Sequence, residues 1–67
     1  MITVEVNGEA REVPEKTTLA ELVTTLGLRP ETVAIELNRS LVTRARHAET
    51  ALSAGDRVEI VTLVGGG

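Results

Sequence analysis

The feature that most constrains the fold of this chain is one short amphipathic helix between strand-like segments. Its apolar stripe has helical spacing and consists of Leu19, Leu22, Val23 and Leu26. Thr18 and Glu21 form a capping box at its start, and Gly27 is the expected left-handed residue at its end, before Pro30. A helix of about nine residues is unstable alone, so the stripe must pack against a sheet.

The N-terminal segment has the pattern of a strand hairpin. Apolar and polar residues alternate over Ile2–Val6, which indicates a strand with one buried face. Asn7 and Gly8 form a strong hairpin turn signal, because both residues tolerate positive φ. The return strand covers residues 11–13 and ends at Pro14, which has no backbone donor.

The second half of the chain adds three extended segments. They cover Val33–Leu37, residues 41–42 and residues 57–63, and the last is the strongest. Residues 38–40 indicate a turn, and residues 43–54 a loop with one helical turn around residues 45–48. His47 lies in this loop, where we expect a neutral histidine on the surface.

The order strand, strand, helix, strand, short strand, strand predicts an α+β domain with one helix across one face of a mixed sheet. The first and last strands would be central, parallel neighbours, as in the β-grasp fold. We predict that residues 1–64 form this domain and that residues 65–67 form a flexible glycine tail.

Composition excludes several classes of function. The chain has 67 residues, no cysteine, no aromatic residue and one histidine, so thiol chemistry, a cysteine-ligated metal site and base stacking are excluded. A net charge of −3 argues against nucleic-acid or anionic-membrane partners. No apolar run approaches about 18 residues, and the N-terminus does not have the pattern of a signal peptide. We expect a soluble cytoplasmic protein with no catalytic residues and no metal site.

The final glycines, Gly65, Gly66 and Gly67, are the most informative feature for function. They add neither packing nor helix propensity and are costly to order, so stability does not explain them. Extended at about 3.3 Å per residue, residues 64–67 would span roughly 13 Å and could enter a narrow channel in a partner enzyme. The carboxylate of Gly67 would become an electrophile after adenylation by ATP. The alternative is a frayed terminus without a role.

The outward face of the last strand is the second informative feature. If Val58 and Ile60 face the helix, Val61 and Leu63 face away from it, where a one-sided sheet normally presents polar residues. The same alternation adds carboxylates to that face, namely Glu5, Glu36 and Glu59. We interpret this face as a docking surface for a partner that bears Arg or Lys. The alternative is ordinary exposed aliphatic residues.

The sequence resembles the ubiquitin-like sulfur carriers of prokaryotes, and most closely the ThiS family of thiamine biosynthesis. The resemblance covers essentially the whole chain. It is most specific over residues 55–61 and from there through Leu63 and Val64 into the three glycines, and residues 33–38 and 49–50 also contribute. Family members often have Asn-Gly in place of residues 38–39 and Pro in place of Thr43.

The resemblance implies that the protein is not an enzyme but a protein co-substrate that binds no cofactor. An enzyme related to ubiquitin-activating enzymes would use ATP and Mg to adenylate Gly67. Sulfur from a cysteine desulfurase, or from another persulfide donor, would then replace AMP and leave a thiocarboxylate. Thiazole synthase would receive this sulfur. Gly65 and Gly66 would enter the partner sites, and Val61 and Leu63 would dock.

Three alternatives share the fold and the glycine ending. The chain could carry sulfur for molybdopterin synthesis or for tRNA thiolation. It could be a ubiquitin-like modifier that is joined through Gly67 to lysines of other proteins. It could also be a plain interaction domain with an idle tail.

Overall fold

The computed structural model describes residues 1–63. The strands of the sheet are β1 (Ile2–Val6), β2 (Glu9–Val13), β3 (Val33–Leu37), β4 (Ser40–Val42) and β5 (Arg57–Thr62). The helices are α1 (Leu19–Thr25) and the 3₁₀ helices η1 (Pro30–Thr32) and η2 (Arg44–Glu49). No helix in this part of the chain is long and apolar enough to cross a membrane. The predicted tail, residues 65–67, and the predicted boundary at residue 64 lie outside the described residues.

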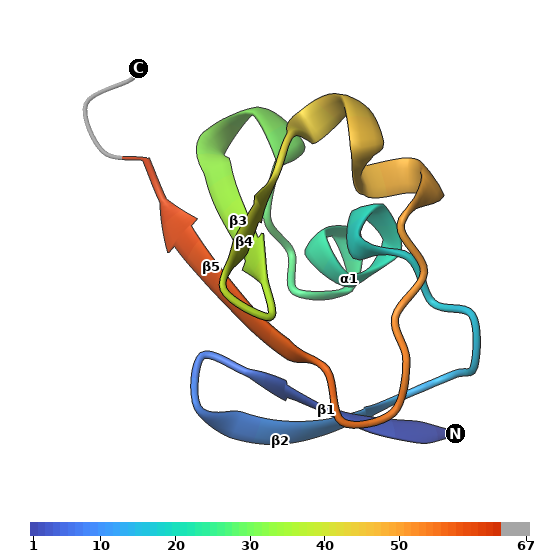
Figure 1. Ribbon diagram of the computed structural model, residues 1–67. Coiled ribbons are helices and arrows are strands. Elements are labelled where there is room, and N and C mark those ends of the chain that lie inside the picture. The colour runs from blue at the N-terminus through green and yellow to red at the C-terminus, as the bar shows by residue number, and fades with distance from the viewer. Residues whose placement is uncertain (64–67) are drawn as a thin grey trace.

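The strands form one mixed sheet in the order β2-β1-β5-β3-β4. β1 and β5 are parallel neighbours, while the other neighbouring pairs are antiparallel. α1 lies across one face of this sheet, and β5 runs diagonally through the molecule away from the β1–β2 hairpin (Figure 1). The predicted α+β architecture, with the first and last strands as central parallel neighbours, is therefore confirmed.

Side-chain and backbone hydrogen bonds fix both ends of α1 as the sequence predicts. The Glu21 amide donates to Thr18 Oγ1 at 3.1 Å, and the Thr18 amide donates to Glu21 Oε1 at 2.8 Å. At the other end Gly27 has φ +75°. Its amide donates to the Thr24 carbonyl, and the Leu28 amide donates to the Val23 carbonyl. These two bonds form a Schellman motif, so the helix ends where glycine permits the left-handed backbone.

Two hairpins have the same two-residue turn. Asn7 and Gly8 have φ 50° and 85°, and Asn38 and Arg39 have φ 50° and 72°. This turn fixes Val6 opposite Glu9, so β2 begins two residues earlier than the sequence indicates. Arg39 is a residue with a Cβ in the left-handed region, where glycine is less strained.

The core lies between α1 and the inner face of the sheet and contains only aliphatic side chains besides His47 and Thr17. Its buried members are Val4, Val6, Val13, Leu19, Leu22, Val23, Val33, Ile35, Leu52, Val58 and Ile60. Apart from Leu52, the core residues therefore come from β1, β2, β3, β5 and α1, on the apolar faces that their periodicity predicts. Burial of this surface is the main contribution to the stability of the domain.

The expectation for His47 was wrong, because the side chain is buried and not on the surface, at 3% exposure. Residues 44–49 form a 3₁₀ helix that packs against α1, and His47 is its buried residue. Nε2 lies 2.9 Å from the Val42 carbonyl oxygen, which can only accept, so Nε2 carries the proton and donates. Nδ1 is buried without a partner in the described part of the chain. His47 thus connects the loop before β5 to β4.

We expect His47→Ala to lower the free energy of unfolding by about 2 kcal/mol, because it leaves a cavity and removes the donor to Val42. Urea denaturation measures this change. Arg46→Ala is the matched control on the same 3₁₀ helix, since Arg46 is exposed and its ion pair within residues 1–63 is with the exposed Glu49. We expect the control to stay within about 0.5 kcal/mol of the wild type. Equal effects of the two substitutions would contradict the structural role of His47.

Candidate functional site: the outer sheet face and the end of β5

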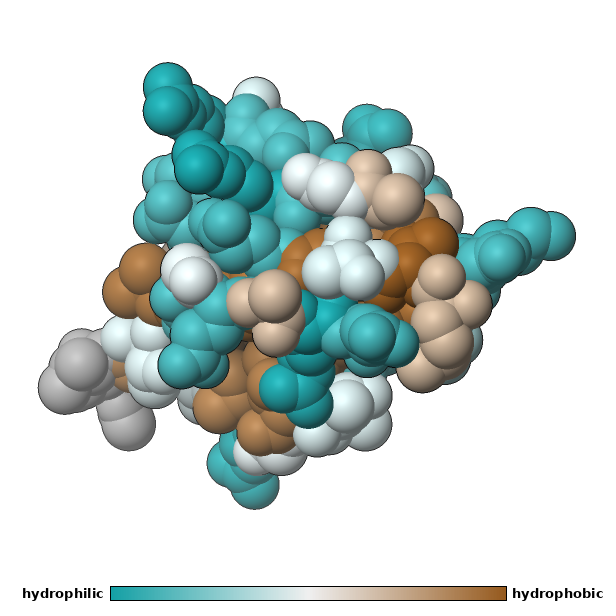
Figure 2. Space-filling view, turned by 90° about the horizontal axis from the view of Figure 1, so that it is seen from below, coloured by the Kyte–Doolittle hydropathy of each residue, from teal (hydrophilic) through white to brown (hydrophobic). Residues whose placement is uncertain are grey.

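The two faces of β5 differ in the way that its sequence predicts. Val58 and Ile60 are 1% and 8% exposed and point toward α1. Val61 and Leu63 are 59% and 52% exposed. Hydrophobic residues reach the surface in separate patches among hydrophilic ones on the face shown in Figure 2. The structure therefore places Val61 and Leu63 at the surface, as the docking hypothesis requires.

Strand register brings two of the predicted carboxylates together. Glu36 in β3 lies directly opposite Glu59 in β5, and Ala34 lies opposite Val61. In the next strand Leu41 lies opposite Glu36 and is 68% exposed. Sequence reasoning missed Leu41, because a strand of three residues has no clear alternation and only the register shows which face it joins. The outer face thus has a carboxylate pair flanked by exposed aliphatic side chains.

Like charges directly opposite each other in a sheet are destabilising. Within residues 1–63, neither Glu36 nor Glu59 takes part in an ion pair. Neutral residues at these two positions would not carry this repulsion. A cationic partner would relieve it, so the pair favours a docking role over an ordinary solvated face.

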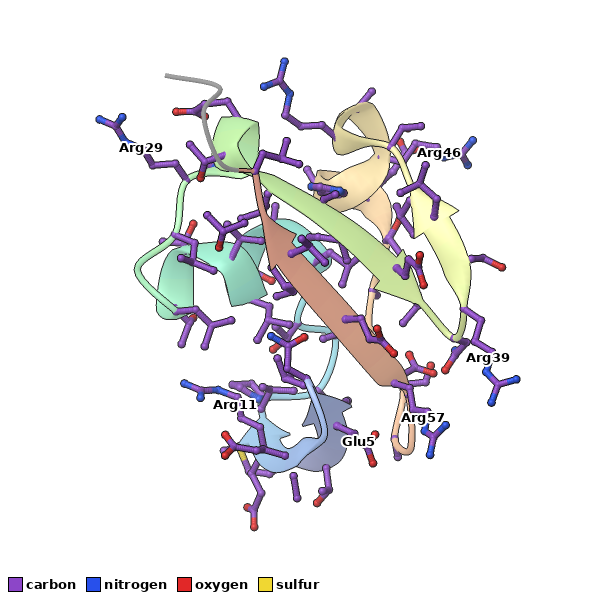
Figure 3. All side chains as sticks on the ribbon, turned by 90° about the vertical axis from the view of Figure 1, so that its left-hand side faces the viewer. Glu5, Arg11, Arg29, Arg39, Arg46 and Arg57 are labelled. Carbon is purple, nitrogen blue, oxygen red and sulfur yellow. The ribbon has the colours of Figure 1, made fainter. Side chains whose placement is uncertain are left out.

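Glu5, the third predicted carboxylate, has a different environment. Its Oε2 lies 3.4 Å from Nε of Arg57, the first residue of β5. Figure 3 shows these two side chains together at one end of the sheet, with Arg39 near the same end. Because Arg57 offsets the charge of Glu5, the uncompensated negative charge of this face is concentrated at Glu36 and Glu59.

Two turn asparagines bind the backbone of β5 from opposite sides. Asn7 Oδ1 accepts from the Ile60 amide at 2.7 Å, and Asn7 Nδ2 donates to the Ile60 carbonyl at 3.2 Å. Asn38 Oδ1 accepts from the Arg57 amide at 2.9 Å, and the Asn38 amide donates to the Arg57 carbonyl at 2.7 Å. Sequence reasoning identified both residues as turn formers and missed these contacts. Together they fix the strand that leads to the glycines.

The end of β5 lies beside η1. The Leu63 amide donates to the Thr32 carbonyl at 2.7 Å, and Val33 pairs with Thr62. Four residues of the sequence, Val64 and the three glycines, follow Leu63. The predicted functional residues Gly65, Gly66 and Gly67 lie outside the described residues.

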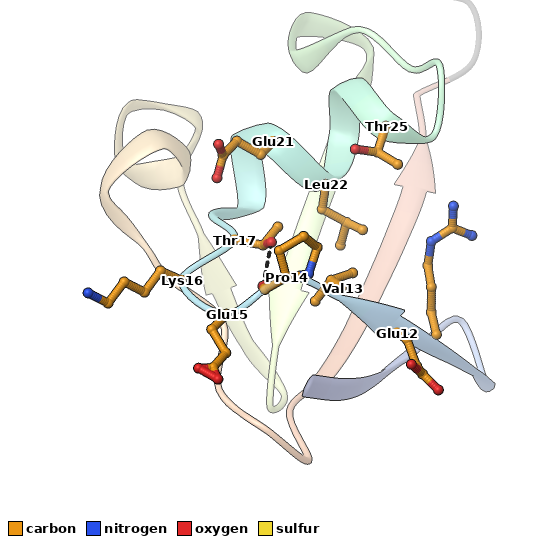
Figure 4. A pocket seen from close by; sticks show the side chains of 10 residues that line it. Glu12, Val13, Pro14, Glu15, Lys16, Thr17, Glu21, Leu22 and Thr25 are labelled. Carbon is orange, nitrogen blue, oxygen red and sulfur yellow. Dashed lines mark hydrogen bonds between the residues drawn. The ribbon is translucent and has the colours of Figure 1, made fainter. Parts of the chain in front are cut away.

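A groove on another part of the surface is a second candidate for a binding site. It lies between β2 and α1 and has a cavity volume of about 470 Å³. Val13 and Leu22 contribute its apolar part, and Thr17 donates to the Pro14 carbonyl in its wall (Figure 4). Its charged residues are of both signs and are Arg11, Glu12, Glu15, Lys16 and Glu21. No residue of β5 lines it, so this groove is separate from the site at the end of β5.

We expect Glu59→Gln to raise the free energy of unfolding by about 0.5 kcal/mol, because it removes one of two facing charges. Urea denaturation at low ionic strength measures the effect, which should shrink as salt screens the pair. Glu12→Gln is the matched control, because Glu12 is also exposed on a strand but faces Thr3. A Glu59→Gln variant less stable than the wild type would show that the pair is not repulsive.

The five-stranded mixed sheet, the single helix across it and the exposed face beside the last strand define a ubiquitin-like β-grasp domain. A sequence model of the ThiS family matches residues 4–67. The chain belongs to the ThiS family.

Solved structures and curated relatives agree with this membership. The crystal structure of a thiamine biosynthesis protein (ThiS) from Geobacter metallireducens has a TM-score of 0.84 and 32% identity and covers 98% of this chain and 100% of that one. A solution structure of a thiamine biosynthesis protein from the same organism has a TM-score of 0.80 and 32% identity and covers 98% and 88%.

Two kinds of curated relative match at similar identity. A thiazole synthase of Magnetococcus marinus is 38% identical over 96% of this chain, and the chain spans about a fifth of the length of that relative, 20%. A thiazole synthase of Paramagnetospirillum magneticum is 37% identical over 92% of this chain and 19% of its own length. An uncharacterized protein, ycf40, of Porphyra purpurea is 36% identical over 98% of this chain and 93% of its own length.

Proposed function

We propose that this protein is a sulfur carrier in thiamine biosynthesis and that the carboxylate of Gly67 is its reacting group. The observation that carries the proposal is the ThiS family match over residues 4–67, which includes the three glycines. The similarity to solved thiamine biosynthesis proteins supports thiamine over the molybdopterin and tRNA-thiolation pathways.

The proposed chemistry is done to this chain by other proteins. An oxygen of the Gly67 carboxylate attacks the α-phosphorus of ATP, pyrophosphate leaves, and an acyl adenylate forms. Sulfide then attacks the acyl carbon, the bond to AMP breaks, and a thiocarboxylate remains. When the sulfur comes from a persulfide, an additional thiol must reduce the resulting acyl disulfide with two electrons. The chain has no cysteine, so its own side chains offer no thiol for the sulfur.

The proposed partners are an adenylating enzyme related to ubiquitin-activating enzymes, a cysteine desulfurase or other persulfide donor, and thiazole synthase. ATP and Mg²⁺ act at the adenylating enzyme and not on a site of this chain, which serves as a co-substrate. Proteins named thiazole synthase that contain a segment similar to nearly the whole of this chain support the last partner. Val61, Leu63, Glu36 and Glu59 form the surface that we assign to docking.

Intact-mass spectrometry tests the proposal directly. The protein is incubated with the adenylating enzyme of the same organism, ATP, Mg²⁺ and sulfide. We expect a mass gain equal to the difference between one sulfur and one oxygen atom, and no gain without ATP. Complementation of a thiazole auxotroph then separates thiamine synthesis from the other sulfur-transfer pathways. An adenylating enzyme that is active on ATP but leaves the mass unchanged would overturn the proposal.

A further inference from the structure

The sheet ends earlier on one side of β5 than on the other. On the β1 side, strand pairing covers only Glu5 opposite Arg57 and Val6 opposite Val58. The Asn7 amide donates to the Val58 carbonyl at 2.9 Å, and the Asn7 side chain then binds both backbone groups of Ile60. After Asn7 the turn leads the chain away into β2. Pairing on this side therefore stops at Ile60, while β3 pairs as far as Thr62.

Backbone alternation identifies the next unpaired position. Arg57 and Leu63 bond toward β3 and η1, through the Asn38 amide and the Thr32 carbonyl, so the odd-numbered residues of β5 face that side. The even-numbered residues face β1, as Val58 and Ile60 do. The amide and carbonyl of Thr62 thus point past Asn7 to a side where no strand of residues 1–63 lies. Thr62 is exposed.

We propose that Thr62 is a docking edge for an extended backbone segment of thiazole synthase, which continues the sheet beyond Asn7. This inference deepens the proposed function and rests on it. An unpaired edge in a strand is a template for strand addition. The bonds at Thr62 would hold the chain in register directly before residues 64–67. Val61 and Leu63 flank this edge with exposed apolar side chains.

Charge favours a partner enzyme over a second copy of this chain as the occupant. Each copy has a net charge of −3, and Glu59, which lies opposite Glu36, is on the same strand as Thr62. Two copies paired at Thr62 would bring these carboxylates toward each other, which is unfavourable. A segment with a basic residue that faces Glu59 would instead relieve the existing repulsion.

Thr62→Pro tests the edge with little disturbance of the sheet. Proline removes the amide of residue 62, which has no strand beside it in the described part of the chain, and leaves the neighbouring ladder bonds in place. Thr62→Ala is the matched control, because it loses the side chain and keeps the amide. Ala10→Pro is a second control, because the register places the Ala10 amide on the outer edge of β2, away from the end of β5. Isothermal titration with the thiazole synthase of the same organism gives the three affinities, and urea denaturation checks folding.

We expect Thr62→Pro to weaken binding at least about tenfold, the equivalent of one lost hydrogen bond and a blocked strand approach. The two controls should bind like the wild type. If Thr62→Pro fails to fold, an amide-to-ester replacement at residue 62, made by semisynthesis, removes the same donor without the ring and should weaken binding in the same direction.

The experiments distinguish failure of the proposed docking edge at Thr62 from failure of the proposed sulfur-carrier function. If the wild type gains sulfur and Thr62→Pro binds as tightly as Thr62→Ala, the edge is wrong and the sulfur-carrier role stands. A wild type that sediments as a dimer, and a Thr62→Pro variant that sediments as a monomer, would assign the edge to a second copy and also overturn the proposal. If the wild type gains no sulfur, it is the proposed function that fails.

Discussion

Deletion of Gly67 should abolish sulfur incorporation, although Gly66 would still supply a glycine carboxylate. The shortened chain would reach about 3.3 Å less far, and misplacement of a reacting group by even about 1 Å can cost about 100-fold in rate. We therefore expect a loss of at least about 100-fold, measured as the rate of mass gain with the adenylating enzyme, ATP and sulfide. Gly66→Trp should reduce the rate of sulfur incorporation by a similar factor. The bulky side chain would not fit in the narrow channel through which we propose that the glycines enter the partner enzyme.

Measurement of the urea unfolding midpoint is the control for both tail variants, because it shows whether the domain still folds. The buried core residues lie between Val4 and Ile60, so the urea midpoint should not change. A matched change inside the domain is Thr25→Ser, at an exposed helix position away from β5, which should gain sulfur at the wild-type rate. A Gly67 deletion that still gained sulfur at the wild-type rate would disprove the assignment of the reacting carboxylate.

We expect Asn7→Asp, a conservative change outside the core, to lower the free energy of unfolding by about 2 kcal/mol. The aspartate can still accept from the Ile60 amide, but its carboxylate would face the Ile60 carbonyl where Nδ2 now donates. Asp tolerates the left-handed backbone of this position nearly as well as Asn does, so backbone strain does not explain the loss. In a small domain this is a large share of the total stability. Urea denaturation at neutral pH measures it.

The pH dependence of the Asn7→Asp destabilisation tests whether the lost bond from Nδ2 to Ile60 is its cause. A protonated carboxyl can donate to the Ile60 carbonyl, so the deficit of Asn7→Asp should shrink as pH falls and the variant carboxyl becomes protonated. Asn7→Gly, which fits φ 50° and removes both side-chain bonds, should remain destabilised at either pH. A deficit of Asn7→Asp that grows or persists in acid would show that the bond from Nδ2 to Ile60 is not its cause.

Much of the fold was predictable because its signals are local. The capping box at Thr18, the left-handed Gly27 and the period-two pattern of β1 depend on residues that are neighbours in the chain, and all three predictions are confirmed. The inward side of β5 followed from alternation alone. The burial of His47 was missed, because the loop between β4 and β5 has no regular period and its packing on α1 is a long-range contact.

The sequence by itself determined which elements form, which of their faces are apolar, and the likeness to the ThiS family that the family match later established. Only the tertiary structure decided which side chains meet. Glu36 faces Glu59, Leu41 joins the outer face, and Asn7 reaches Ile60 across 53 positions of sequence. The physical reason is that local patterns fix the conformation of each segment, whereas strand order and register fix the contacts between segments.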